Sequence, residues 1–297
     1  MKEIIKKSNN KSVKMENHLP INAITAKIND ENNFIVTISD KDFNRYVVVL
    51  NESGEVKKAL LNTSDDSVKI ARDKEYFYVI SSTHHNTKLY KFSLSDLSLE
   101  ETREFPFTDM GSIAVNDDYI YLFDASEGYI YELEKDLKTN NKIDVNEYYQ
   151  NYHQHSFNYI AATNSGFTSI GLPCSEEEFY EFKAFMYDKF GKTISEENDF
   201  IKSVSYDKKN NIGYISFNNF IIIVDKEGID SILHFKKDSI ISVNYDDFDA
   251  DSLVICFAGN KPLTGNVKVI NKDTIDKLKT PVKYKNNKQK KMISTPK

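Results

Sequence analysis

The sequence predicts an all-β fold, and three observations lead to this prediction. First, short apolar runs rich in aromatic and β-branched residues recur along most of the 297-residue chain, and they suit strands better than helices. Second, these runs fall into units of four, whose starting points lie about 38 to 47 residues apart. Third, the turns within the units resemble one another. Together these observations predict a six-bladed β-propeller of four-stranded antiparallel blades.

The clearest unit contains the runs Tyr119–Phe123 and Tyr129–Leu133, which are separated by the polar break Asp-Ala-Ser-Glu-Gly. Neither run alternates with polar residues, so we expect both faces of these strands to be covered. The same pattern predicts six units, beginning near Ile21, Ser67, Met110, Phe157, Ile201 and Ser239.

The turn after the third strand supports the alignment of the units. An Asx residue is followed three positions later by Gly in Asn51–Gly54, Asp188–Gly191 and Asp225–Gly228. This spacing is typical of a tight turn, because the Asx side chain binds the local backbone and Gly adopts positive φ. Residues 175–190 also fit a helix, with a capping box at Ser175–Glu178, but we favour a strand from Lys183 because the turn follows it in register.

The sixth unit lacks a convincing fourth strand, and a propeller must join its last blade to its first or leave an open edge. We expect a segment within residues 2–18 to pair with Val267–Ile270 and close the ring. The alternative is a strand over Ile275–Tyr284, which Pro281 weakens because it removes a hydrogen-bond donor.

The meander with its Asp-x-x-Gly turns resembles the six-bladed propellers of the TolB and NHL type over roughly residues 21–280. The resemblance is one of architecture and implies no particular activity. The chain has no Trp, so the Trp-Asp dipeptide of WD40 repeats is absent, and it has no Gly-Gly pair of the kelch type. Propellers serve as enzymes, receptors and scaffolds, so the fold does not decide the function.

Charge separates the chain into three parts: an N-terminal arm (1–20), the propeller (21–280) and a basic tail (281–297), which we expect to be flexible. The formal net charge is −6, but residues 1–15 carry +4 and residues 281–297 carry +6, so the middle is strongly acidic. A nucleic-acid-binding protein would carry basic charge on a folded face, so we expect no nucleic-acid partner.

The cellular context follows from what the sequence lacks. Cys174 and Cys256 form no CxxC motif and no disulfide framework, and Cys256 lies within an apolar strand, where we expect it in the core. The longest apolar run, Phe220–Val224, is far below transmembrane length, and no apolar segment follows the basic N-terminus. We therefore expect a soluble, cytoplasmic monomer with no membrane partner.

The candidate binding residues gather on one predicted face, which we call the top face. It carries the loops between second and third strands and the links between units. These segments contain His84 and His85, Lys261, and a link with three tyrosines and two histidines. The link residues are Tyr148, Tyr149, Tyr152, His153 and His155. The tyrosines suit an aromatic contact surface, although they also suit packing of the link against the rim.

The sequence therefore predicts a non-enzymatic binding or scaffold protein that contacts a protein or peptide through this face, with no cofactor. The alternative is a propeller enzyme, a metal-assisted hydrolase or lyase, that uses His84, His153, His155 and the acids Glu176–Glu178. Cys174 has no identified base, and no phosphate loop, HExxH or GxSxG motif occurs. A third hypothesis is a small molecule bound in the central channel.

Overall fold

The structure is a computed structural model, and it describes most of the strands predicted from the sequence. The residues that it describes are 11–63, 67–83, 85–107, 110–145, 160–164, 166–170, 201–225, 228–235, 239–246, 248, 251–281 and 293–294.

Five antiparallel sheets of four or more strands form the body of the protein, and we call them blades I to V in ring order. Blade I contains β2 (Leu19–Ile28), β3 (Glu31–Ser39), β4 (Arg45–Leu50) and β5 (Val56–Thr63). Blade II contains β6 (Ser67–Arg72), β7 (Tyr76–Ser82), β8 (Thr87–Ser93) and β9 (Leu99–Phe105). Blade III contains β10 (Met110–Val115), β11 (Ile120–Asp124), β12 (Tyr129–Leu133) and β13 (Thr139–Asp144).

The second half of the chain supplies the other sheets. A three-stranded sheet follows blade III, with β14 (Ile160–Thr163), β15 (Gly166–Ile170) and β24 (Ile293–Ser294). Blade IV contains β16 (Ser203–Asp207), β17 (Ile212–Ser216), β18 (Phe220–Asp225), β19 (Gly228–His234) and β23 (Thr280–Pro281). Blade V contains β20 (Ser239–Asp246), β21 (Ser252–Ala258), β22 (Thr264–Asn271) and β1 (Ser12–Glu16).

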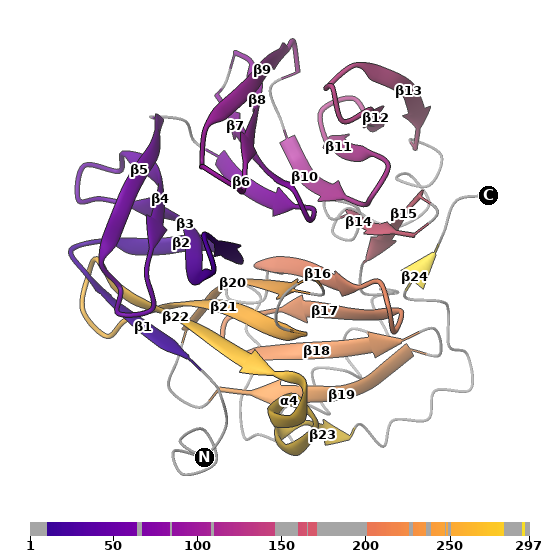
Figure 1. The fold of residues 1–297 in the computed structure, drawn as a ribbon. Helices are drawn as coiled ribbons and strands as arrows, with labels where there is room; N and C mark the ends of the chain where they lie inside the picture. The colour runs from indigo at the N-terminus through magenta and orange to yellow at the C-terminus, as the bar shows by residue number, and fades with distance from the viewer. Residues whose placement is uncertain are drawn as a thin grey trace.

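The sheets follow one another around a ring, so the protein is a β-propeller (Figure 1). The first strand of each sheet contacts the first strand of the next, and β20 returns to contact β2. The four-stranded antiparallel blades are confirmed, but the expected count of six is not. The described residues form five such blades, and the sheet between blades III and IV has three strands. Its expected third strand, Lys183–Tyr187, lies outside the described residues.

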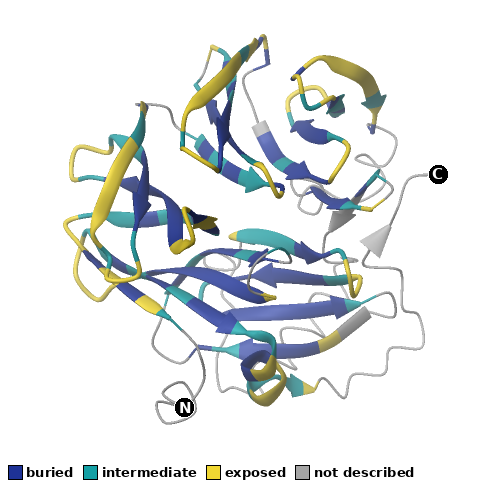
Figure 2. Ribbon diagram, in the orientation of Figure 1, coloured by how far each residue is buried: buried dark blue, intermediate teal, exposed yellow. Residues whose placement is uncertain are grey.

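The core consists of layers between successive blades rather than one central cluster. Every residue of β11 is buried, as the unbroken apolar run predicted. Cys256 is 1% exposed in the layer between blades V and I, which confirms its expected place in the core. Figure 2 shows a gradient of burial in blades I to III, where the inner strands are largely buried and the outermost strands β5, β9 and β13 are largely exposed.

The turn chemistry predicted from the sequence is present in blade I. The Asn51 side-chain oxygen accepts hydrogen bonds from the backbone N–H groups of Ser53 and Glu55, at 3.1 and 2.9 Å. Gly54 has a φ of +88°, a conformation that costs glycine little because it lacks a Cβ.

The N-terminal arm supplies the outer strand of blade V. β1 pairs antiparallel with β22, with Val13 opposite Val267, which is the ring closure expected from the sequence. The Lys11 ammonium also pairs with the carboxylate of Glu52 in a turn of blade I, so the arm joins blade V to blade I. The wider division into arm, propeller and tail stays a prediction.

The alternative closing strand over residues 275–284 is wrong. Lys272–Leu278 form the helix α4 instead, and β23 pairs with β19 of blade IV rather than with blade V. Asn271 caps the helix by accepting a hydrogen bond from the Thr274 N–H at 3.0 Å. No helix of the described chain is long and apolar enough to cross a membrane.

Two residues of the basic tail, Ile293 and Ser294, form β24 and pair with the end of β15. The remaining residues of the tail, 282–292 and 295–297, lie outside the described residues. The mobility of the tail as a whole stays a prediction.

Candidate functional site

The top face is identified by the strand order of the sheets. The first strand of each sheet lies at the centre of the ring, and the strands then alternate in direction. The loops between second and third strands therefore share one face with the links between blades. This face includes His85 between β7 and β8, and Lys261 between β21 and β22, and both residues are exposed.

The two residues belong to different blades, and the structure does not bring them together. His85 lies on blade II and Lys261 on blade V, with blade I between them in the ring. The backbone N–H of His85 donates to Thr83 Oγ1 at 3.1 Å, which fixes this short turn. The other predicted binding residues lie outside the described residues: His84, Tyr148, Tyr149, Tyr152, His153 and His155.

Blade I contributes an exposed aromatic residue between these two positions. Phe43, in the loop between β3 and β4, is 84% exposed and belongs to the top face by its strand position. Phe43 is not among the binding residues predicted from the sequence. A usable signal was present, because Asp40 and Asn44 flank Phe43 and are typical of a structured turn.

The loop that carries Phe43 is fixed by Asp40. One carboxylate oxygen accepts hydrogen bonds from the backbone N–H groups of Asp42 and Asn44, at 2.8 and 2.9 Å. The other accepts the Tyr46 hydroxyl at 3.1 Å. Hydrogen bonds from the Asn44 side chain and from these N–H groups lower the pKa of Asp40, although partial desolvation opposes them. The Asp40 carboxylate is therefore charged at neutral pH, and in this form it accepts the hydrogen bonds that hold the loop.

Phe43 itself has a φ of +62°, which is unusual for a large side chain. Such conformations cost on the order of 1–3 kcal/mol and persist only where the surroundings impose them. The loop thus maintains a strained backbone that leaves an aromatic ring in water.

The centre of the ring contains a cavity of about 110 Å³. The first strands of all five blades and of the three-stranded sheet contribute to its wall. The wall includes the bottom ends of these strands, which lead into the turns between first and second strands. We call the face formed by these turns the bottom face.

Three side chains from different blades meet at the bottom end of the cavity. The Arg72 guanidinium carbon and the Lys208 Nζ lie 4.9 and 4.6 Å from the centre of the Phe248 ring of blade V. Arg72 also donates a hydrogen bond to the Thr25 carbonyl of blade I at 2.6 Å. None of these three residues was predicted from the sequence, because each lies at the end of a different strand and only the closed ring brings them together.

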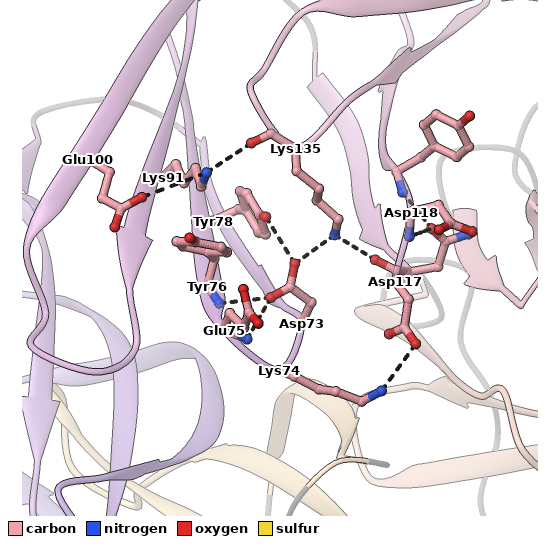
Figure 3. Close-up of polar contacts among 12 residues, drawn as sticks. Asp73, Lys74, Glu75, Tyr76, Tyr78, Lys91, Glu100, Asp117, Asp118 and Lys135 are labelled. Atoms are coloured by element: carbon pink, nitrogen blue, oxygen red, sulfur yellow. Dashed lines mark hydrogen bonds and ion pairs between the residues drawn. The ribbon is translucent and has the colours of Figure 1, made fainter.

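A polar network on the bottom face joins blades II and III (Figure 3). Asp73 follows β6, and one of its carboxylate oxygens accepts the Glu75 and Tyr76 N–H groups at 2.9 and 2.8 Å. The other accepts the Tyr78 hydroxyl at 3.0 Å and lies 2.6 Å from the Lys135 Nζ of blade III. Lys135 also donates to the carbonyl of Asn116. The network therefore fixes blade III against blade II.

Burial and charge pairing oppose each other in this network. Burial raises the pKa of Asp73. The Lys135 ammonium and the two N–H donors lower it by more than burial raises it, so the pKa lies below the ordinary value of 3.8. Burial lowers the pKa of Lys135, and the bond with Asp73 acts in the opposite direction. Burial and the adjacent carboxylate raise the pKa of Tyr78 well above its ordinary value. The carboxylate and the ammonium are both charged at neutral pH.

No group of three or more His, Cys, Asp or Glu residues that could hold a metal occurs within the described ranges. The residues on which the enzyme alternative depends are His84, His153, His155, Cys174 and Glu176–Glu178, and they lie outside these ranges. The alternative therefore stays untested.

Comparison with known proteins assigns no family to the chain. No family model and no curated protein sequence matches the chain. Among solved structures, the chain is similar to the Dos1 propeller, with 8% identity and a TM-score of 0.39 over 85% of this chain and 54% of that one. It is also similar to BBS1N in complex with ARL6DN, with 7% identity and a TM-score of 0.35 over 85% and 66% of the two chains.

A third similar structure is Hsv2 from Kluyvelomyces marxianus, with 8% identity and a TM-score of 0.42 over 81% of this chain and 73% of that one. The chain spans about half the length of the first structure, the Dos1 propeller. At these scores the matches support no argument about function, and the assignment as a propeller rests on the sheets of this chain.

Proposed function

We propose that this propeller is a binding protein that contacts a protein or peptide partner through its top face. The observation that carries the proposal is Phe43, an exposed ring held in a strained conformation by the hydrogen bonds of Asp40. Single exposed apolar residues are common and need no explanation. Here the backbone is strained as well, and strain of this kind is concentrated at functional sites.

The positions of the neighbouring loops support the same proposal. Lys261 of blade V and His85 of blade II are exposed on either side of Phe43 in the ring. An aromatic anchor with polar residues around it is the usual composition of a protein-binding hot spot. The partner is accordingly one that offers an apolar recess or side chain to Phe43 and hydrogen-bond acceptors to Lys261.

Site-specific photocrosslinking tests this proposal. A photoreactive phenylalanine analogue at position 43 should give one defined protein adduct in cells that express the chain. The same analogue at Val56, which is exposed on the outer strand β5, should not give that adduct. With the purified partner, Phe43→Ala should weaken binding at least tenfold, as expected for an aromatic hot spot, without lowering the melting temperature. Equal adducts at both positions would contradict the proposal.

We further propose that the three-stranded sheet is a sixth blade, related to propellers of the TolB and NHL type. It occupies one place in the ring, and β14 and β15 are the expected first and second strands. Hydrogen exchange tests this, because residues 183–187 should be strongly protected if they form the third strand. Exchange at the rate of an unstructured peptide would leave five complete blades.

A further inference from the structure

The loop that carries Phe43 has a charge pattern that complements itself. Lys41 and Asp42 precede the ring in the loop between β3 and β4, and both residues are exposed. Within the described part of the chain, neither side chain forms an ion pair. Phe43 therefore lies beside two charges of opposite sign that no described residue neutralises.

The adjacent corner of blade V has the same composition. Lys261 is exposed between β21 and β22, and Glu16 is exposed at the end of β1. The residue opposite Glu16 in the pairing of β1 with β22 is Thr264, only three positions after Lys261. Neither charge forms an ion pair with a described residue. A Cβ on Gly265 would collide with the Pro20 ring, so this corner packs directly against the start of blade I.

Hydrogen bonds within each loop fix both loops in place. The Asp40 carboxylate holds the loop of Phe43 through the bonds described above. In the loop of blade V, the Gly259 N–H donates to the Thr264 carbonyl at 2.6 Å, and the Thr264 hydroxyl donates to the Lys261 carbonyl at 2.7 Å. Loops that are already ordered lose little conformational entropy on binding, which favours association through them.

We propose that the partner bound through Phe43 is a second copy of this chain, in a dimer with two-fold symmetry. The inference rests on the proposed function of the top face, and it departs from the monomer expected from the sequence. In a two-fold dimer each contact occurs twice, so the patch formed by Phe43 and the charges around it must complement itself. The Lys41 ammonium of one copy meets the Asp42 carboxylate of the other, and the reciprocal pair forms across the axis. The two Phe43 rings pack between these pairs, where an offset stack adds to the effect of their burial.

The charge balance of the patch favours a second copy over a partner of one predominant charge. The chain has a net charge of −6, so two copies repel each other in most orientations. The patch instead presents Lys41 and Lys261 together with Asp42 and Glu16, and these four charges balance. A strongly acidic or basic partner would be attracted to two of them and repelled by the other two. A second copy, related by the two-fold axis, offers both signs.

Sedimentation velocity of the purified full-length protein tests the proposal. Between micromolar and millimolar concentrations the 34.3 kDa chain should form dimers and no larger species, because a two-fold contact closes on itself. Phe43→Ala should weaken dimerisation at least tenfold. Phe43→Gly should do the same and yet melt no lower than the wild type, because glycine adopts the positive φ of this position without strain. A protein that stays monomeric throughout, or one that dimerises equally well without the ring, would overturn the proposal.

Charge reversal identifies the paired groups. Lys41→Glu and Asp42→Lys, each made alone, place like charges opposite each other and should weaken dimerisation at least tenfold. The double variant with both changes restores the two pairs in reversed order and should dimerise within about threefold of the wild type. Lys57→Glu, an equal change of charge at an exposed position of β5, is the control and should dimerise like the wild type. Equal losses in the Lys41 and Lys57 variants, or no recovery in the double variant, would refute the pairing.

Photocrosslinking at position 43 separates this inference from the proposed function. An adduct of twice the chain mass should form both in cells and with the purified protein. An adduct with a different protein in cells, together with a monomer in solution, would keep the top face as a binding surface and refute the second copy as its partner. No adduct in cells, together with a monomer in solution, would refute both.

Discussion

Lys135 Nζ lies 2.6 Å from Asp73 Oδ2, and this ion pair joins a turn of blade III to a turn of blade II. Asp73 is nearly buried, with 8% of its side chain exposed, whereas 25% of the Lys135 side chain is exposed. The pair belongs to a network in which the same carboxylate also accepts two backbone N–H groups and a tyrosine hydroxyl. It is therefore a structural link between blades, and its loss should affect stability before it affects binding.

Replacing Lys135 with Met should lower the free energy of unfolding by about 3 kcal/mol, because it leaves a buried carboxylate without its counter-charge. Urea denaturation followed by fluorescence or circular dichroism measures this change. The matched control is Lys138→Met. Lys138 also lies 2.6 Å from an acid, Asp136, but both side chains are well exposed, so its loss should cost less than about 1 kcal/mol. Equal effects of the two substitutions would contradict a special role for the buried pair.

The same carboxylate should give a defined pH dependence. Because the pKa of Asp73 is lower in the folded protein than the ordinary 3.8, its contribution to stability is complete above the unfolded-state pKa. It is lost as the pH falls through the lower folded-state pKa. The unfolding free energy of the wild-type protein should therefore fall more steeply below about pH 4 than that of Asp73→Asn. Parallel curves for the two proteins between pH 6 and pH 2.5 would show that Asp73 does not contribute.

Much of the fold could be predicted from the sequence, because propeller strands are short and their turns carry local signals. The strands around Tyr119–Leu133 were expected almost to the residue, since apolar runs and the polar break Asp-Ala-Ser-Glu-Gly between them are both local features. The helix α4 was missed, although Asn271 before Asp273 and the spacing of Ile275 and Leu278 are typical of a capped amphipathic helix. This region was weighed only as an alternative closing strand, because a propeller blade needs a fourth strand.

The site could be predicted only in part. The strand order was enough to place His85 and Lys261 on one face, because it depends on the alternation of antiparallel strands. The cluster of Arg72, Lys208 and Phe248 could not be predicted. Its members are far apart in sequence, and their meeting depends on the closure of the whole ring. Long-range closure of this kind leaves no local signal in a single sequence.

The helix cap offers a small test of the C-terminal segment. Asn271→Ala should lower the unfolding free energy by about 1 kcal/mol, because it removes the hydrogen bond to the Thr274 N–H. Asn260→Ala, at an exposed position in the loop between β21 and β22, is the control and should change it by less than about 0.5 kcal/mol. A neutral Asn271→Ala would mean that α4 contributes little to the stability of the folded protein.

Ring closure by the N-terminal arm depends on Val13 of β1. Val13 is buried against blade V and approaches the turn at Gly54 of blade I. Its side chain therefore lies at the joint between the last blade and the first. Val13→Ala should cost about 2 kcal/mol, because it leaves a cavity at this joint. Lys14→Ala, on the exposed side of the same strand, should cost less than about 0.5 kcal/mol.

Deleting residues 1–18 removes β1 altogether and leaves blade V with three strands and an unpaired edge on β22. The melting temperature should fall by at least the amount seen for Val13→Ala, and the truncated protein should aggregate on heating. Differential scanning calorimetry of the wild type, the two point variants and the truncation measures all four stabilities. If the truncated protein melted like the wild type, β1 would be dispensable, and some other contact would have to hold blade V to blade I.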